Sequence, residues 1–289
     1  MIHIAILDCD LPVPAVYPTR GLYSSQFRTL LQSAAARLPR NIAIHTTAFD
    51  VVGGCLPPLA SLRTDPRSEN EPPSPSNPLA QPIDAILITG AAAGAYETDT
   101  HAWIIPLTSY LRTVYRDFPH VRFFGSCFGH QILAQTLLSS SLKNEPCPHG
   151  REMGLVPVSL EERFLASFPS VATLLPDRNL RLQMIHGDWV VPVSRDTNNV
   201  VELPEPWMNI GSTAQCPVQG LFCPGRVLTF QGHFEFDVFV NGETCQEFAR
   251  RMGWDKDRVR EWLGLIERGQ DGDDAKVAAE IVVMFFADV

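Results

Sequence analysis

The residues best suited to chemistry in this chain are a cysteine set between two glycines and, far downstream, a histidine followed by a glutamate. The cysteine lies in Gly125-Ser126-Cys127-Phe128-Gly129, after an apolar run at 121–124 and before a helix-like run at 131–138. This is the glycine-x-nucleophile-x-glycine pattern of a strand that turns sharply into a helix. Glycines tolerate the crowded backbone of such a turn. The helix N-terminus favours a thiolate, so the pattern predicts Cys127 as a nucleophile.

His233 and Glu235 follow the apolar segment 227–230, which we predict to be a strand. Open α/β sheets carry their chemistry at the carboxyl ends of such strands. A glutamate two residues away can accept the imidazole N–H, fix its tautomer and stabilise the imidazolium. We therefore predict His233 as the base and Glu235 as its orienting partner. The remaining cysteines are interpreted as inert buried thiols: Cys9, Cys55, Cys147, Cys216, Cys223 and Cys245.

A tetrahedral oxyanion needs N–H donors. The turn offers the N–H of Phe128, and the small-residue loop 90–95 offers that of Ala91, with Gly90 leaving the backbone accessible. Gln131, one turn into the predicted helix, is a candidate for binding a polar substrate end, but a structurally satisfied amide fits the sequence as well. His186 follows a short predicted strand, and a structural histidine fits there too.

Strand and helix patterns alternate over the first half of the chain, which indicates a parallel α/β sheet with right-handed crossovers. A Pro- and Ser-rich surface insertion is predicted at 55–82, and a helical C-terminal extension at 243–289 of a single domain spanning 1–289. Predicted strands lie at 2–7, 42–52, 83–89, 121–126, 154–160, 182–185, 189–193, 208–212, 218–222 and 227–230. Predicted helices lie at 23–38, 103–115, 131–138, 243–252, 257–268 and 273–287.

Composition narrows the class of protein. The 289 residues are 45% hydrophobic and 19% charged, as in a globular enzyme, and the formal net charge of −9 argues against nucleic acid or anionic membrane as a partner. No apolar run is long enough to span a bilayer. The 7 cysteines are unevenly spaced, so a reducing cytoplasm is expected. No metal-ligand spacing, P-loop or dinucleotide fingerprint is present, so we expect no metal and no cofactor.

Four blocks together resemble the class I glutamine amidotransferase superfamily. They are 88–96, 124–131, 186–188 and 230–236. The resemblance implies a flavodoxin-like fold, with a mostly parallel central sheet, helices on both faces and a Cys-His-Glu triad at the carboxyl ends of the strands. The implied site residues are the catalytic Cys127, His233 and Glu235, the oxyanion donors Ala91 and Phe128, and the substrate-binding Gly90, Gln131, His186, Gly187 and Asp188.

Within that superfamily, the segments 129–134 and 216–220 are similar to a free-standing branch that includes plant γ-glutamyl peptidases. The chain departs from the usual pattern at Phe234, where proline is common, and in its alanine-rich 90–95 loop. The resemblance implies a cysteine amidase that cleaves a small γ-glutamyl amide or peptide through a Cys127 thioester. A glutaminase that supplies ammonia to a separate synthetase, an acyl transferase and a non-catalytic binding module of the same fold remain as alternatives.

Overall fold

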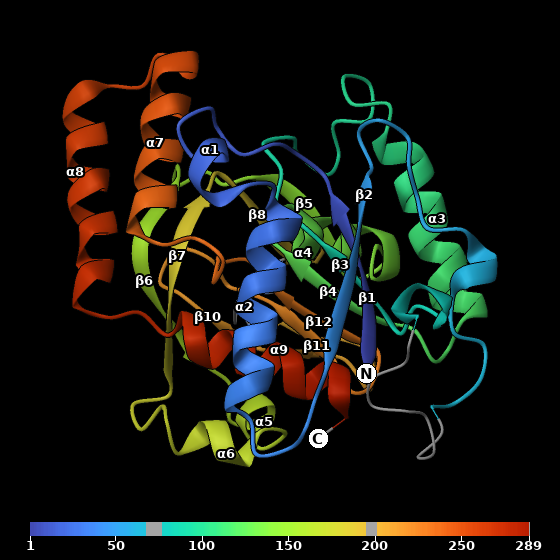
Figure 1. Ribbon diagram of the computed structural model, residues 1–289. Coiled ribbons are helices and arrows are strands. Elements are labelled where there is room, and N and C mark those ends of the chain that lie inside the picture. The colour runs from blue at the N-terminus through green and yellow to red at the C-terminus, as the bar shows by residue number, and fades with distance from the viewer. Residues whose placement is uncertain (68–76, 195–200, 289) are drawn as a thin grey trace.

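The computed structural model describes residues 1–67, 77–194 and 201–288. A seven-stranded sheet with the order β2-β1-β3-β4-β12-β11-β9 forms its centre (Figure 1). The five strands from β2 to β12 are parallel neighbours, and β11 and β9 add antiparallel at the edge, so the predicted mostly parallel sheet is confirmed. The strands are β1 Ile2–Asp8, β2 Ile44–Asp50, β3 Ala85–Ile88, β4 Arg122–Ser126, β9 Met208–Asn209, β11 Leu221–Cys223 and β12 Val227–Phe230.

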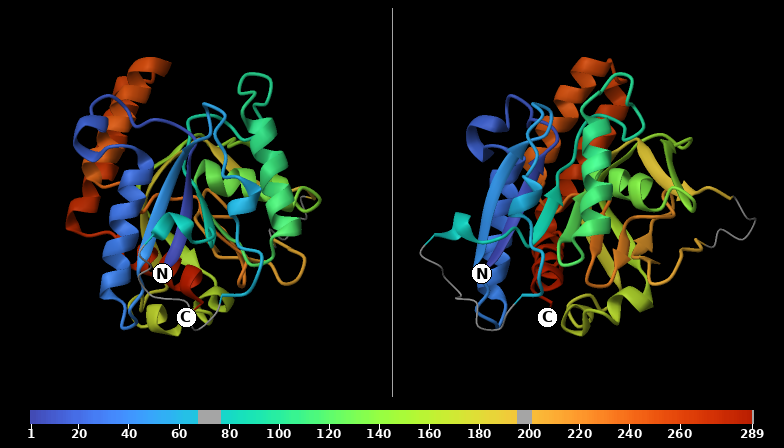
Figure 2. Two further views of the ribbon diagram at one scale, coloured as in Figure 1. Left: turned by 45° about the vertical axis from the view of Figure 1, so that its right-hand side comes forward. Right: turned by 90° about the vertical axis from the view of Figure 1, so that its right-hand side faces the viewer.

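Helices cover both faces of this sheet, as predicted (Figure 2). Helix α2 (Tyr23–Arg37) and helix α9 (Ala275–Ala287) pack on one face, against alternate side chains such as Ile4 and Phe124. Helix α3 (Ile104–Asp117) and helix α4 (Phe128–Leu137) pack on the other. Because successive strand residues point to opposite faces, the mainly apolar strands β1, β3 and β12 supply both cores at once.

Phe234, which stands where proline is usual, fills the core on the α2 face. Its ring lies 5.4 Å from that of Phe27, 5.7 Å from Phe124 and 6.4 Å from Phe230, measured between centroids. Edge and tilted contacts of this kind add to the energy of burial. The aromatic side chain therefore anchors the segment that carries His233 and Glu235.

Two small antiparallel sheets flank the central one: β10-β6-β7 and β5-β8. The segment 208–212, predicted as one strand, divides between β9 in the central sheet and β10 in a flanking sheet. A Cβ on Gly211 would lie 2.3 Å from the Ser159 carbonyl oxygen, so glycine permits this change of sheet. Strand β5 was not predicted, because Leu-Lys-Asn-Glu-Pro lacks β-branched residues. These strands are β5 Leu142–Pro146, β6 Glu152–Leu160, β7 Asn179–His186, β8 Asp188–Pro192 and β10 Gly211–Ser212.

Two helices near the C-terminus stand beside the carboxyl ends of the parallel strands (Figure 1). Helix α7 (Val238–Met252) begins earlier than the predicted residue 243, because the Asp237 carboxylate caps it by accepting the N–H of Val240 at 2.8 Å. Helix α8 (Lys256–Glu267) packs against α7. Shorter helical segments are α1 Tyr17–Arg20, α5 Glu162–Leu165, α6 Pro169–Ala172, η1 Leu59–Ser61, η2 Pro78–Ala80 and η3 Arg268–Asp271.

The centre of the predicted insertion, 68–76, lies outside the described residues. Its described flanks are tied to the sheet: Leu62 pairs with Ile83 in a parallel bridge, and the Arg63 Nε lies 2.5 Å from the Asp84 carboxylate in a buried ion pair. Within the described residues, no helix combines the length and apolarity needed to cross a bilayer.

Candidate active site

Cys127 occupies the sharp turn between β4 and α4, with a φ of 50° that non-glycine residues rarely adopt. The flanking glycines are needed for close backbone contact. A Cβ on Gly125 would lie 2.4 Å from the Gly129 carbonyl oxygen, and one on Gly129 would lie 2.3 Å from that of Ile88. The turn is therefore pressed against β3, and α4 begins at the residue after the cysteine.

His233 follows β12 and is almost fully buried. Its backbone N–H donates to the Gln183 carbonyl at 2.9 Å, and its ring stacks on Phe236 with centroids 4.1 Å apart. The Nδ1 atom lies 2.8 Å from Glu235 Oε1. The hydroxyl of Ser126, next to the cysteine, donates to the same carboxylate oxygen at 2.9 Å. These contacts fix the orientation of both the imidazole and the glutamate.

Gly90, after β3, lies between the cysteine and the histidine. A Cβ placed on it would lie 3.0 Å from His233 Cε1 and 3.6 Å from Cys127 Cβ. The structure thus brings Cys127, His233 and Glu235 together at the carboxyl ends of neighbouring parallel strands, which is the place predicted for them. Ala91 borders the same space, and Phe128 is the first residue of helix α4.

The charges in this cluster favour the protonated form of His233. Burial lowers the pKa of His233, but the negative charges of Glu235 and Cys127, with the hydrogen bonds to both, outweigh it and raise that pKa to about 10. An imidazolium at neutral pH stabilises a thiolate beside it, and a thiolate is the reactive form of cysteine. The arrangement is therefore suited to nucleophilic attack by sulfur.

A cavity of about 30 Å³ opens onto the cysteine sulfur and His233. Several residues that line this cavity were not predicted as site residues: Asp10, Tyr23, Ile185, Phe236, Thr244 and Phe248. The Asp10 carboxylate accepts the N–H of Ala92 at 2.9 Å and so holds the alanine-rich loop in place. Thr244 and Phe248 come from α7. A larger cavity, of about 930 Å³, lies beside β9 and β10 and includes neither Cys127 nor His233, so we place the chemistry at the smaller one.

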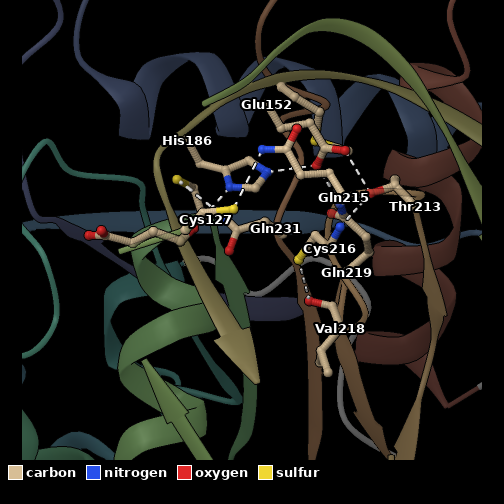
Figure 3. Close-up of polar contacts among 12 residues, drawn as sticks. Cys127, Glu152, His186, Thr213, Gln215, Cys216, Val218, Gln219 and Gln231 are labelled. Atoms are coloured by element: carbon tan, nitrogen blue, oxygen red, sulfur yellow. Dashed lines mark hydrogen bonds and ion pairs between the residues drawn. The ribbon is translucent and has the colours of Figure 1, made fainter. Parts of the chain in front are cut away.

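Gln231 is a site residue that sequence reasoning missed. Its Nε2 donates to Cys127 Sγ at 3.5 Å (Figure 3). Its Oε1 accepts from Gln131 Nε2 at 3.2 Å. The Gln131 amide also lies 3.4 Å from the Asp188 carbonyl. Gln131 is therefore linked to the sulfur only indirectly, by its hydrogen bond to Gln231. The available signal was the position of Gln231 at the end of a predicted strand, two residues before His233.

The histidine at 186 joins a buried polar cluster. Its Nδ1 lies 2.9 Å from the Asp188 carbonyl and its Nε2 lies 2.9 Å from Glu152 Oε2. Glu152 also accepts from Thr213 and Gln219, each at 2.6 Å (Figure 3). Burial raises the pKa of Glu152, but these hydrogen bonds and the imidazole outweigh it and lower that pKa. His186 thus supports the backbone of Asp188 and does not line the cavity at the sulfur.

Replacing Gln231 with leucine is expected to slow alkylation of Cys127 by iodoacetamide at pH 7 about tenfold, because one hydrogen bond to the thiolate is lost. The rate is measured by mass spectrometry of the labelled peptide. Gln135→Leu is the matched control, since the Gln135 amide donates to the Ala95 carbonyl and does not contact the sulfur. Equal rates for Gln231→Leu and the unsubstituted protein would show that the amide does not stabilise the thiolate.

Comparison with known proteins gives relatives over most of the chain, although no family model matches it. A putative glutamine amidotransferase-like protein of Schizosaccharomyces pombe is 30% identical over 271 residues, which cover 94% of each chain. A putative glutamine amidotransferase of Saccharomyces cerevisiae is 34% identical over 158 residues, 54% of each chain.

Two solved structures with the same fold are of proteins named glutamine amidotransferases. That of Thermotoga maritima superimposes with a TM-score of 0.62 at 15% identity, covering 99% of this chain and 98% of the other. That of Methylobacillus flagellatus gives a TM-score of 0.54 at 14% identity, covering 98% and 94%. At these identities the likeness concerns the fold alone.

Proposed function

Because the chain belongs to the class I glutamine amidotransferase-like family, we propose that it is a cysteine-dependent amidase that cleaves a γ-glutamyl amide or peptide. The observation that supports this most directly is the buried contact of 2.8 Å between His233 and Glu235, next to a cysteine at the start of a helix. A buried imidazole backed by a carboxylate beside a thiol is the arrangement that activates a cysteine nucleophile.

In the proposed reaction, the Cys127 thiolate attacks the γ-glutamyl carbonyl carbon and the carbonyl electron pair moves to oxygen. The N–H groups of Ala91 and Phe128 receive the oxyanion. The tetrahedral intermediate collapses as the C–N bond breaks, and the His233 imidazolium gives its proton to the departing amine. Water, deprotonated by the neutral imidazole, then attacks the thioester. This step releases glutamate, regenerates the thiolate and returns the proton to His233.

Two candidates for the departing amine have separate support. The resemblance of 129–134 and 216–220 to γ-glutamyl peptidases favours a peptide or conjugate. The names of the two relatives, a glutamine amidotransferase-like protein and a glutamine amidotransferase, favour a glutaminase working with a separate synthetase. The two candidates are distinguished by comparing the turnover rates of L-glutamine and of a glutathione conjugate with the same preparation. Only a glutaminase would cleave L-glutamine faster. If neither is cleaved, the proposed hydrolysis is wrong, and the acyl-transferase and binding-module alternatives take its place.

Replacing Glu235 with glutamine is expected to shift the alkaline limb of the kcat/KM–pH profile to lower pH. The proton on His233 is needed by the departing amine, and activity falls as pH rises through the pKa of that imidazole, which is raised to about 10 in this site. Without the Glu235 charge, the pKa moves back toward the ordinary value of roughly 6.5. The profile is measured between pH 6 and pH 11 with a γ-glutamyl anilide. An unchanged alkaline limb would contradict the assigned role of Glu235.

A further inference from the structure

Phe236 presents the face of its ring to the imidazole of His233. The two rings are nearly parallel, with an interplanar angle of 14° and centroids 4.1 Å apart. Phenylalanine rings in the neighbouring core meet differently, at interplanar angles of 59° to 84°, as neutral rings often do. Because the face of an aromatic ring is its negative side, a second ring stacked closely on it is attracted more strongly when that ring is a cation.

Packing fixes the Phe236 ring in this position. The residue is 4% exposed and shares a buried apolar cluster with Val16 and Val240. On helix α2, the Tyr23 ring also stacks on it, with centroids 5.8 Å apart and an interplanar angle of 23°. Turning the Phe236 ring away from His233 would disrupt these contacts, so the stack on the imidazole is a fixed part of the site.

The charged and titratable groups around this imidazole come from several segments. Glu235 Oε1 lies 2.8 Å from Nδ1, and Cys127 shares the small cavity with the imidazole. Asp10 and Tyr23 line the same cavity. Among the described residues that line it, the loop after β3, strand β7 and helix α7 contribute uncharged ones: Gly90, Ala91, Ala92, Ile185, Thr244 and Phe248. Glu235 therefore stabilises the imidazolium at its edge, whereas Phe236 contacts its face.

We propose that Phe236 is a positioning residue that holds His233 as an imidazolium by a cation–π contact and, through that charge, holds Cys127 as a thiolate. The catalytic meaning of this assignment rests on the proposed function, to which it adds a residue. His233 is 3% exposed, and a cation–π contact is strongest where water is excluded. Weakening the negative face of the ring should therefore lower the proton affinity of the imidazole, so that the imidazolium is lost at a lower pH.

The test is NMR of the full chain labelled with carbon-13 at the histidine Cε1 atoms, titrated between pH 6 and pH 11 without substrate. The His233 signal is assigned by its absence from His233→Asn. In the unsubstituted chain, the pKa of His233 is raised to about 10. Phe236→Leu should lower the midpoint by about one pH unit, which is a tenfold loss of proton affinity.

Two further variants at Phe236 separate the charge of the ring face from packing. A trifluorinated phenylalanine keeps the ring but withdraws electrons from its face, so it should also lower the midpoint. Phe236→Tyr keeps an electron-rich face and should titrate close to the unsubstituted chain. An unchanged midpoint with the trifluorinated ring would overturn the assignment, because the contact would then be packing alone. This variant also provides the test if Phe236→Leu does not fold.

Phe168→Leu is the matched control, since Phe168 is 5% exposed and packs on the rings of Phe164 and Phe222. It should leave the His233 midpoint unchanged, and an equal shift in this variant would contradict a specific role for Phe236. Because the titration needs no substrate, it is independent of the proposed function. The expected shifts in a protein that cleaves no γ-glutamyl substrate would refute the amidase alone. Turnover together with a midpoint that is indifferent to the Phe236 variants would refute the cation–π role alone.

Discussion

Replacing Cys127 with alanine is expected to reduce kcat for γ-glutamyl amide hydrolysis by about 10⁴-fold or more. The sulfur is the atom that becomes acylated, so the alanine variant has no covalent route, and only N–H donation from Ala91 and Phe128 remains to assist water. KM should change little, because the substitution removes the reacting atom and leaves the other residues that line the cavity in place. Steady-state release of glutamate measures both constants.

Cys55→Ala is the matched control for that loss. The interpretation of Cys55 as a buried thiol was wrong, because this cysteine is an exposed free thiol in the loop after β2 and lies outside the site. The Cys55→Ala variant should retain the activity of the unsubstituted chain. Circular dichroism of Cys127→Ala should match that of the unsubstituted chain, since removing a sulfur from a site that is 7% exposed leaves the sheet contacts in place. Full turnover by Cys127→Ala on every γ-glutamyl substrate tested would remove the sulfur from the mechanism.

Replacing Gly129 with alanine is expected to lower the free energy of unfolding by about 3 kcal/mol or more, at the upper end of the range for overpacked sites. The new Cβ would lie 2.3 Å from the carbonyl oxygen of Ile88 and 3.0 Å from its carbonyl carbon. Both are backbone atoms of a buried parallel strand, so no rotamer change relieves the overlap. Helix α4 would have to separate from β3, and the geometry at Cys127 would be lost with it. Urea denaturation followed by tryptophan fluorescence measures the change.

The same substitution at Gly264 is expected to leave the free energy of unfolding unchanged or to raise it. A Cβ at Gly264, within α8, meets nothing within 4 Å. Alanine is favoured over glycine in a helix by about 1 kcal/mol, so this variant should be as stable as the unsubstituted chain or slightly more so. Similar stabilities for Gly129→Ala and Gly264→Ala would mean that the turn at Cys127 is not as tightly packed as the structure has it.

The parallel core was predictable because its signals are local. Strands β1, β3 and β12 are short, mainly apolar runs, and each is bounded by small or polar residues. The glycines around Cys127 are a local signal as well, since each marks a close backbone approach. The same reasoning placed His233 after a strand, and the pairing of β12 with β4 brings it beside the cysteine.

Contacts between distant segments could not be predicted in this way. Thr244 and Phe248 reach the cavity only because α7 turns back over the strand ends. Gln231 was visible in the sequence, but its contact with the sulfur depends on the tertiary fold. The division of 208–212 between two sheets depends on Gly211 passing close to Ser159, which no local pattern indicates.

The catalytic roles of Cys127, His233 and Glu235 remain predictions, and one measurement tests them together. The full chain is mixed with a γ-glutamyl anilide, quenched with acid during the first turnovers, and digested for mass spectrometry. We predict that the peptide containing Cys127 carries the mass of one γ-glutamyl group, and that this adduct forms far more slowly in His233→Asn. An adduct on another residue, or anilide cleavage without any acylated Cys127, would contradict the account.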